Sequence, residues 1–232
     1  MQGVVPAAGR GTRLRPHTDD RPKALVDVGG KPLLAHGFET LAPHVDEFVV
    51  VVGYLGDRIR EHYGSGYRGT PITYVDQPER DGLADAVLRA EPAVDGPFLQ
   101  LNGDNVLRGN VGDVARRHRE TKADATLLVD RVSPDRARRG GVLELEDDEL
   151  VGIVEKPDDP PSWLATTGCF AFSERVFDAC RAIEPSERGE FELADAIEWL
   201  LDYGSRVETV RLDGWRVNVN TAENIERAEA SL

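Results

Sequence analysis

The sequence predicts a layered α/β domain in which helices pack around a mixed, mostly parallel sheet. Short apolar runs rich in β-branched residues alternate with helical patterns along almost the whole chain. The run EFVVVVGY at residues 47–54 is nearly all apolar, as expected of a strand that is buried on both faces. Residues 140–157, GGVLELEDDELVGIVEKP, break the alternation and indicate two strands joined by an acidic turn, which makes the sheet mixed.

In the N-terminal half, strands and helices alternate regularly. The apolar run GVVPA at residues 3–7 predicts a strand that leads into a loop, and residues 31–44 predict a helix. Beyond them, continuous or alternating apolar residues indicate strands, and apolar residues at helical spacing indicate helices. On this basis we predict strands at 47–54, 71–77 and 97–105, the last ending in a polar turn, and helices at 57–64, 82–91 and 111–122.

The C-terminal half follows the same pattern on either side of the two strands in residues 140–157. The apolar run at residues 123–132 predicts the strand before them. The residues after them predict strands at 168–173, 206–212 and 215–219 and helices at 175–183, 191–204 and 222–232. Thr221 is the expected cap of the last helix, because its hydroxyl can accept a free backbone N–H at a helix start.

Length and composition indicate one soluble domain over residues 1–232. The net charge of −14 argues against nucleic acid or an anionic membrane as a partner. No apolar run approaches the roughly 20 residues that span a bilayer, and the start of the chain does not resemble a signal peptide, so we expect a cytoplasmic protein. Cys169 and Cys180 lie in apolar surroundings and are interpreted as reduced core thiols.

Lysine is rare in this chain. Only four of the 28 basic residues are lysines, which leaves 24 arginines. A surface that is acidic and poor in lysine is what a high-salt cytoplasm or a GC-rich genome could produce.

The first candidate site is the segment from Ala7 to Lys23, AAGRGTRLRPHTDDRPK, which follows the first strand. Its glycines let backbone N–H groups approach phosphate oxygens, and its basic side chains supply countercharge. Residues 1–25 hold five basic and two acidic groups, a local charge of +3 in an acidic protein. The segment lacks the lysine–serine pair of a P-loop and the glycine spacing of a dinucleotide fold. We interpret it as an anion site, with an ordinary glycine-rich turn as the alternative.

Three further positions carry candidate ligands. Asp104 follows a buried strand, at the edge where ligands bind in α/β sheets, and could reach a metal bound to phosphates, although it could also be a turn residue. Glu155 and Lys156 stand together before Pro157; both can serve one ligand only if the strand ends there, and the alternative is a surface ion pair. Lysine recurs at positions 23 and 156 in an arginine-rich chain, which favours a role for the compact ammonium.

The last candidate is the run DGWRVNVNTAENIERAE, in which Asn218 and Asn220 alternate with apolar residues just before a helix. Residues two apart on a strand share one face, so both side chains should point the same way. An asparagine can bind a metal through its carbonyl oxygen but adds no charge, which makes it a weaker ligand than aspartate.

These motifs, in this order, resemble the sugar nucleotidyltransferase family, in particular glucose-1-phosphate thymidylyltransferases and related uridylyltransferases. The resemblance covers nearly the whole chain. AAGRGTRLRPHT with RPKALVDVGGKPLL resembles the nucleotide-phosphate signature and QPERDGLADAV the base-recognition segment. GDN resembles the metal-aspartate motif, and EKP with TTG the sugar-phosphate site. Together the motifs are specific, whereas any one alone is not.

The resemblance implies a Rossmann-like, GT-A-like α/β/α sandwich and an Mg²⁺-dependent reaction in which UTP or dTTP and a hexose 1-phosphate, such as glucose 1-phosphate, give an NDP-sugar and pyrophosphate. No covalent intermediate is expected, because this chemistry needs positioning and charge neutralisation more than a protein nucleophile. Relatives are often homo-oligomers, so a homo-oligomer is possible here.

The resemblance also assigns residue roles. Arg13, Lys23 and Asp104 are the implied catalytic residues, the first two stabilising charge on the triphosphate and Asp104 holding the metal. Further implied nucleotide-binding residues are Ala8, Gly9, Gly11, Thr12, Gln77 and Gly82, of which Gln77 and Gly82 would read the base edge. Implied sugar-phosphate residues are Gly141, Glu155, Lys156 and Thr167. Asn218 and Asn220 are the candidates for a second metal ligand.

The chain also departs from the family pattern. Asn218 stands where the family commonly has an aspartate, and Gly140 stands in place of a tyrosine before the pocket glycine. Pro6 and Asn102 are likewise unusual at their positions. Two alternatives therefore stay open at this point: a nucleotide or sugar-nucleotide sensor without turnover, and an enzyme that uses GTP or CTP.

Overall fold

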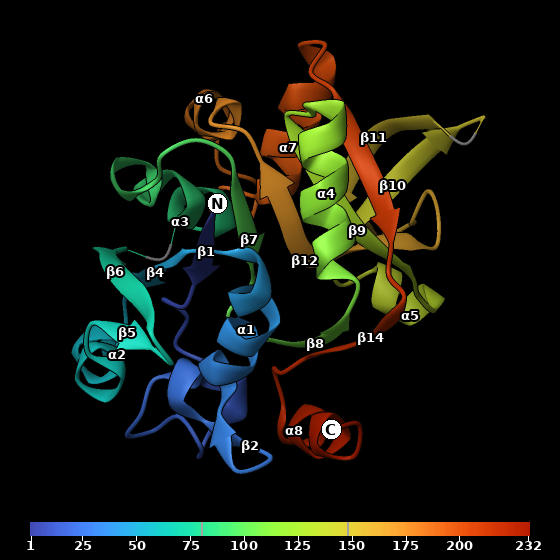
Figure 1. The fold of residues 1–232 in the computed structure, drawn as a ribbon. Helices are drawn as coiled ribbons and strands as arrows, with labels where there is room; N and C mark the ends of the chain where they lie inside the picture. Colours follow the sequence, from blue (N-terminus) through green and yellow to red (C-terminus); the bar gives the residue numbers. More distant parts are fainter. Residues whose placement is uncertain (80, 148) are drawn as a thin grey trace.

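A ten-stranded sheet forms the centre of the computed structural model, which describes residues 1–79, 81–147 and 149–232 (Figure 1). The strand order is β11-β10-β12-β7-β1-β4-β6-β5, and β9 pairs with β12 and β13. The strands of this sheet are β1 (Gln2–Pro6), β4 (Glu47–Val52), β5 (Gly66–Tyr67), β6 (Thr70–Asp76), β7 (Phe98–Leu101), β9 (Ala125–Arg131), β10 (Gly141–Glu146), β11 (Glu149–Glu155), β12 (Leu164–Phe172) and β13 (Val207–Arg211).

The pairing confirms the prediction of a mixed sheet. The strands β7, β1, β4 and β6 run parallel, and β13 is parallel to β9. The hairpin predicted within residues 140–157 is present as antiparallel β10 and β11, and β12 runs antiparallel to β7, β9 and β10. Two predicted positions, Asp148 in the acidic turn and Arg80 in the base-recognition segment, lie outside the described residues.

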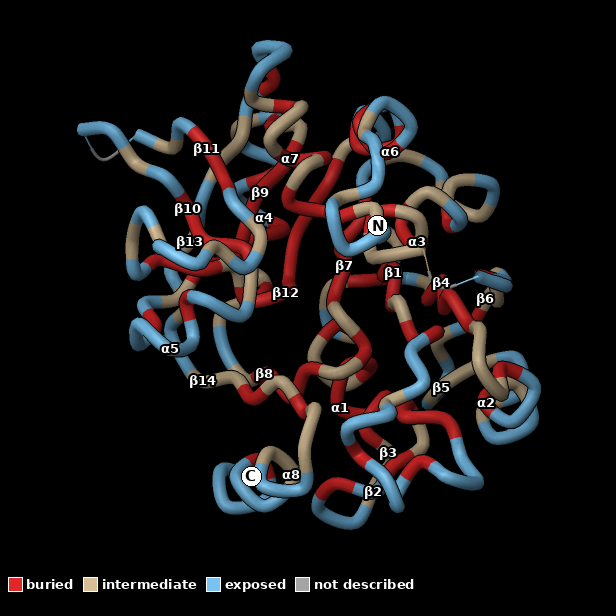
Figure 2. The backbone as a smooth tube through the Cα atoms, turned by 180° about the vertical axis from the view of Figure 1, so that it is seen from behind, coloured by how far each residue is buried: buried red, intermediate tan, exposed pale blue. Residues whose placement is uncertain are grey.

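Helices cover both faces of the sheet, as the alternation of its strand residues requires. Val4, Val49 and Val51 pack on the side of α3 (Leu83–Arg89), α6 (Arg175–Ala182) and α7 (Leu193–Asp202). Val5 and Val50 pack on the opposite side, where α1 (Leu33–Leu41), α2 (Gly56–Tyr63) and α4 (Val111–Thr121) lie. Figure 2 shows buried backbone concentrated in β1, β7 and β12. The molecule is therefore a three-layer α/β/α sandwich, as predicted.

The two cysteines lie in these two separate cores. Cys169 belongs to the core beside α1 and α4, and Cys180 to the core beside α6 and α7. Both are free, and burial raises the pKa of each thiol to about 12. Their predicted position in the core is confirmed.

β8 (Asn105–Gly109) and β14 (Gly214–Asn218) form a second, two-stranded ribbon. The strand predicted at 215–219 corresponds to β14, but its partner β8 was not predicted. The strand predicted at 97–105 ends at Leu101, and a turn then leads into β8. Asn105 pairs with Asn218, and Val219 N–H donates to the carbonyl of Asp104 at 2.8 Å. The ribbon therefore brings the metal-aspartate motif next to the two asparagines that lie more than a hundred residues later.

The first helix begins later than predicted. Lys31 and Pro32 form β3, which pairs with β2 (Asp27–Val28), so α1 begins at Leu33. A proline fixes φ and donates no backbone hydrogen bond, which suits it to the position just before a helix. The remaining predicted elements are present with ends shifted by a few residues, and α8 (Ala222–Glu229) follows the expected Thr221 cap. Within the described residues, no helix is both long and apolar enough to cross a membrane.

Candidate functional site

Two adjoining cavities open at the carboxyl ends of the parallel strands β1 and β7. The first has a volume of about 340 Å³ and is bordered by Ala8, Gln77 and Gly82, and the second, of about 640 Å³, by Gly141 and Glu155. Both cavities share four lining residues: Leu83, Asn102, Asp104 and Glu190. The carboxyl edge of an α/β sheet is the usual ligand site, because side chains and loops from several strands converge there.

The loop after β1 forms one wall of the first cavity. Ala7 N–H donates to Val51 O at 2.8 Å, and Gly103 N–H donates to Pro6 O at 3.0 Å, so the loop is fastened to both neighbouring strands. Gly11 has a φ of 65°, and a Cβ there would lie 3.0 Å from the side chains of Thr18 and Lys23. Glycine at position 11 thus lets the loop turn tightly against Lys23.

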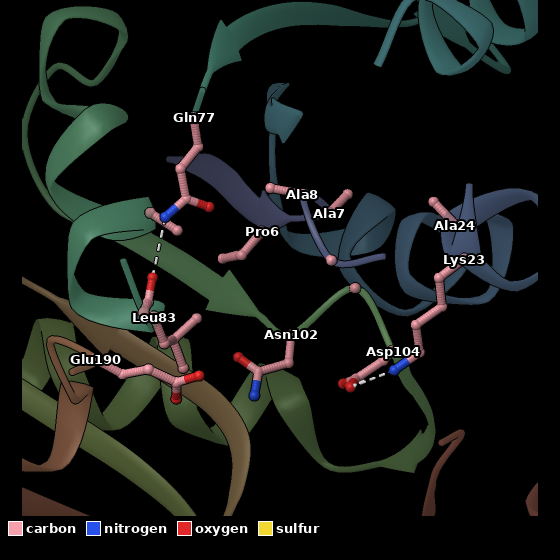
Figure 3. A pocket seen from close by; sticks show the side chains of 14 residues that line it. Pro6, Ala7, Ala8, Lys23, Ala24, Gln77, Leu83, Asn102, Asp104 and Glu190 are labelled. Carbon is pink, nitrogen blue, oxygen red and sulfur yellow. Dashed lines mark hydrogen bonds and ion pairs between the residues drawn. The ribbon is translucent and has the colours of Figure 1, made fainter. Parts of the chain in front are cut away.

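Lys23 lies at the end of the first cavity, where its side chain points toward Asp104 (Figure 3). Its Nζ donates to Asp104 Oδ2 and to Asn220 Oδ1, both at 2.8 Å, and its side chain is largely buried. Arg13 donates to the same Asn220 oxygen at 3.0 Å. Two cations therefore converge on the edge shared by the two cavities, which is a favourable place for a polyphosphate.

The donor atoms at this edge fit a magnesium ion. Asp104 Oδ1 is buried and has no hydrogen-bond partner among the described residues. Asn220 shares the Lys23 ammonium with Asp104, and its Nδ2 donates to Asn218 Oδ1, so the two amides are linked to this carboxylate through Lys23. Magnesium binds one or two protein carboxylates and completes its shell with water and phosphate oxygens. The described residues contain no cluster of three or more His, Cys, Asp or Glu side chains suited to a metal, so Asp104 would act with amide, water or phosphate oxygens.

Gln77 lies at the opposite end of the first cavity, with its side chain pointing inward (Figure 3). Its Nε2 donates to Gly82 O at 3.0 Å and to Asp85 Oδ2 at 2.8 Å. Because both partners are acceptors, the amide nitrogen faces them and Oε1 is left for a ligand. Gly82 has a φ of 113°, and a Cβ there would lie 2.3 Å from Phe191 O, so this turn requires glycine.

Glu155 and Lys156 line the second cavity from the end of β11. They form an ion pair at 3.2 Å, and a φ of 48° at Lys156 turns the chain out of the strand. Because the strand ends there, both side chains can face the same cavity. Burial raises the pKa of Glu155, while Lys156 opposes that rise. A Cβ on Gly141 would lie 3.3 Å from Glu155 Oε2, so glycine at this position keeps the carboxylate accessible.

The comparison with known proteins agrees with this geometry. A family model described as "Nucleotidyl transferase" matches residues 2–222. The chain belongs to the nucleotidyl transferase family. A UTP–glucose-1-phosphate uridylyltransferase of Haloferax volcanii is 46% identical over 234 residues, covering 100% of this chain and 96% of that protein. A glucose-1-phosphate thymidylyltransferase of Streptomyces griseus is 38% identical over 97% of this chain but 64% of its own length.

A solved structure extends the likeness to three dimensions. A putative glucose-1-phosphate thymidylyltransferase from Bacillus anthracis, in complex with a sucrose, superposes with a TM-score of 0.90. It is 29% identical and covers 99% of this chain and 94% of its own. This nucleotidyl transferase therefore has the fold of its family along the chain.

Most residues that the sequence assigned to the site of this nucleotidyl transferase lie at the two cavities. The first cavity is lined by Ala8, Gly9, Lys23, Gln77, Gly82 and Asp104. The second is lined by Arg13, Asp104, Gly141, Glu155, Lys156, Thr167, Asn218 and Asn220. Gly11 and Thr12 line neither cavity. The backbone of Thr167 lies at the second cavity, but its hydroxyl donates to Leu128 O at 2.9 Å, away from a ligand.

Other lining residues of this nucleotidyl transferase went unassigned in the sequence. Asn102 was noted only as unusual, yet it lines both cavities and accepts a hydrogen bond from buried Gln100 at 2.7 Å. Its place just before Gly103 and Asp104 was a usable signal. The sequence around Glu190 carried no such signal. Its loop reaches the cavity only in the folded chain, where the Phe191 N–H donates to Asp81 O.

Proposed function

We propose that this chain transfers a uridylyl or thymidylyl group from UTP or dTTP to glucose 1-phosphate, with magnesium, and releases pyrophosphate. A phosphate oxygen of the sugar phosphate would attack the α-phosphorus of the nucleotide. The bond from the α-phosphorus to the bridging oxygen of the β-phosphate would break, so that pyrophosphate leaves on the opposite side. The relatives from Haloferax volcanii and Streptomyces griseus carry names that fit this reaction.

The observation that carries the proposal is the position of Lys23 and Asp104 at the boundary of two cavities. A nucleotide in the first cavity and a sugar phosphate in the second would meet at these residues. Lys23 and Arg13 would neutralise the charge that develops on the phosphate oxygens, and such preorganised charge is commonly the largest part of rate enhancement. Neither residue forms a covalent bond to the substrate in this scheme.

The first cavity suits a uracil or thymine base. Gln77 Oε1 is an acceptor, because the nitrogen of that amide is held by Gly82 O and Asp85. Uracil and thymine present an N3–H donor between two carbonyl oxygens, whereas cytosine presents an acceptor at N3. An acceptor facing an acceptor loses the hydrogen bond and leaves two buried polar atoms unpaired.

Asp104 would hold the magnesium ion, with Asn218 or Asn220 contributing an amide oxygen. Magnesium supplies charge neutralisation on the phosphates and an orienting centre for them. In the structure the Lys23 ammonium contacts both Asp104 and Asn220. For Asn220 to bind the metal, its Oδ1 would have to leave Lys23; otherwise Asn218 would supply the amide oxygen.

The second cavity would hold the sugar. Glu155 would accept hydrogen bonds from sugar hydroxyls, and Lys156 would bind the sugar phosphate. Thr166 also lies close to this site, because its hydroxyl is 3.3 Å from where a Cβ on Gly141 would stand. Its hydroxyl is thus better placed toward the sugar than that of Thr167.

The test is a panel of the five common nucleoside triphosphates against glucose, mannose and N-acetylglucosamine 1-phosphates, measured by pyrophosphate release. We expect turnover with UTP or dTTP and glucose 1-phosphate. Turnover with GTP alone would overturn the base assignment. Nucleotide binding without pyrophosphate release in any combination, over a full range of magnesium concentrations, would replace the enzyme with a sensor.

A further inference from the structure

One wall of the second cavity is rich in arginine side chains that the proposed function does not use. Arg136 belongs to α5 (Pro134–Ala137), Arg216 to β14 and Arg227 to α8, and all three line this cavity. Figure 1 and Figure 2 both show β14 between α5 and α8. Segments far apart in the sequence thus place three guanidinium groups along one side of a single cavity.

These arginines have no carboxylate at salt-bridge distance within the described residues, although Asp104 and Asp130 lie near enough to Arg216 to favour its charged form. Elsewhere the chain pairs arginine with carboxylate, as in Arg117 with Glu208 at 2.7 Å. Among the described residues, Arg136, Arg216 and Arg227 form no salt bridge, although the chain has 42 acidic and 28 basic residues. A shortage of carboxylates is therefore not the reason.

Arg216 is the most confined of the three. It donates to Thr166 O at 3.1 Å, but its Nε is buried without a hydrogen-bond partner among the described residues. Burial, and then Arg136, lower the pKa of Arg216 to about 10, and the same two causes lower the pKa of Arg227. Arg216 is therefore a confined guanidinium with two exposed cationic neighbours, an arrangement that a bound anion would stabilise.

We propose that Arg136, Arg216 and Arg227 form a second phosphate-binding subsite, separate from the glycine-rich loop. This inference rests on the proposed function, which supplies two sources of such a group: the phosphate of the sugar 1-phosphate and the released pyrophosphate. The planar guanidinium fork matches phosphate oxygens and can bind them through two hydrogen bonds.

The position of Arg216 connects this subsite to the reaction. Residues two apart on a strand share a face, so Arg216 points to the same side of β14 as Asn218. Arg13, which contacts Asn220 beside the candidate metal site, lines the same cavity. The arginine subsite and Arg13 therefore open into the same cavity.

The first experiment measures steady-state kinetics of the Arg136→Gln/Arg227→Gln double variant at constant ionic strength. Both side chains are exposed, so the fold should be retained. Arg119→Gln is the matched control, because Arg119 is also exposed and forms no salt bridge within the described residues but lies outside both cavities. We expect the KM for glucose 1-phosphate, or the inhibition constant of pyrophosphate, to rise at least about 10-fold in the double variant only.

The pattern of the change identifies the source of the phosphate group. A rise confined to the KM for glucose 1-phosphate assigns the subsite to the sugar phosphate, and a rise confined to pyrophosphate inhibition assigns it to the product. The KM for the nucleotide should stay within about twofold, since the nucleotide loop is intact. If neither constant changes, or if Arg119→Gln causes the same change, the subsite does not exist.

Calorimetry separates this inference from the proposed function. Inorganic pyrophosphate and glucose 1-phosphate are each titrated into the wild-type protein and the double variant. The wild-type protein could lack turnover and still bind one of these titrants at least about 10-fold more tightly than the double variant does. In that case the subsite is retained and the proposed reaction fails. Equal affinities of both proteins for both titrants would overturn the subsite itself.

Discussion

Lys23 Nζ and Asp104 Oδ2 lie 2.8 Å apart, and the same ammonium contacts Asn220 Oδ1 at an equal distance. The pair joins the loop after β1 to the end of β7, and the ribbon of β8 and β14 adds Asn220. Only 9% of Lys23 is exposed, so these oxygen partners replace the water that burial removes from the ammonium. A preformed cation and carboxylate at the boundary of two cavities are the basis for the first two predictions.

Replacing Asp104 with asparagine should abolish most turnover while the protein stays folded. The substitution keeps the shape of the side chain but removes the carboxylate that lies beside Lys23 and Asn220 and would hold the metal. We expect kcat to fall by about 10²–10³-fold or more, as for loss of a key charged group in a preorganised site. Pyrophosphate release measures the rate, and thermal unfolding checks the fold. A variant with the wild-type rate would remove Asp104 from the mechanism.

Replacing Asn218 with aspartate should strengthen magnesium binding. A second carboxylate beside Asp104 adds charge to a ligand set that otherwise relies on neutral amides. We expect the magnesium concentration for half-maximal activity to fall by about 10-fold, measured by magnesium titration after treatment with a chelator. The comparison is Asn220→Asp. If only that variant lowers the midpoint, Asn220 is the ligand, and if neither does, both asparagines lie outside the metal shell.

Replacing Asp85 with alanine should weaken the choice between UTP and CTP. Asp85 and Gly82 O hold the nitrogen of the Gln77 amide, and with Gly82 O alone the amide is less firmly held and can more easily turn a donor toward the base. The ratio of kcat/KM for UTP over CTP should fall about 3- to 10-fold, the worth of one hydrogen bond. Arg89→Ala is the matched control, because Arg89 contacts Asp85 at 3.1 Å without touching Gln77. An unchanged ratio would show that Gln77 is oriented by other contacts.

The pH profile of kcat/KM for glucose 1-phosphate should have an acid limb that is caused by protonation of Glu155. Burial raises the pKa of this carboxyl above its usual range, and protonation would remove its capacity to accept from sugar hydroxyls. The kcat/KM for glucose 1-phosphate should therefore fall as the pH drops through this raised pKa. In Glu155→Gln the limb should disappear and the neutral-pH value should fall about 10-fold. Glu149→Gln, an exposed change on the same strand, should keep the wild-type profile.

The stability of the folded protein should also decrease as the pH is lowered, because of His36. Its side chain is fully buried, with Nε2 2.8 Å from Val28 O and Nδ1 3.3 Å from Arg108. Since Arg108 can only donate, Nδ1 accepts, and the neutral ring donates from Nε2. Burial lowers the pKa of His36. The unfolded chain then binds a proton that the folded chain does not, so stability is present above the unfolded pKa of about 6.5 and is lost as the pH falls through the lower folded value.

The measurement is the free energy of unfolding in denaturant at about pH 7.5, 6.5 and 5.5, a range that spans the unfolded histidine pKa of about 6.5. Each histidine of this kind contributes at most about 1.4 kcal/mol per pH unit in this range. We expect a smaller slope in His36→Gln than in the wild type. A His36→Gln slope equal to that of the wild type would assign the pH dependence to other groups.

The strongly apolar and periodic parts of the fold were predictable. The valines of β4 are buried on both faces, and their apolar run allowed no other interpretation. The ribbon of β8 and β14 was only half foreseen, because Asn105–Gly109 directly follows a polar turn and pairs with residues a hundred positions later. Short strands of this kind owe their existence to a distant partner, which local patterns do not contain.

The candidate site divides in the same way. Local chemistry in the sequence pointed to Lys23, Asp104, Glu155 and Lys156, since each stands in a motif at a strand end or a glycine-rich loop. Thr167 shows the limit of this approach. The sequence gives no register for the pairing of β12 with β9, and in the folded chain the Thr167 hydroxyl bonds to Leu128 O.

The amino-acid sequence by itself determined the layered α/β class, the anion-binding character of the loop after the first strand and the kinds of side chain available for phosphate chemistry. Tertiary structure alone decided that Lys23 bridges Asp104 and Asn220, that Gln77 keeps its oxygen free, and that Arg136, Arg216 and Arg227 share a cavity. The physical reason is that periodicity and residue type act over a few neighbouring residues, whereas a site needs groups from several segments at hydrogen-bond distance. Those distances are set by strand pairing and packing across the whole chain.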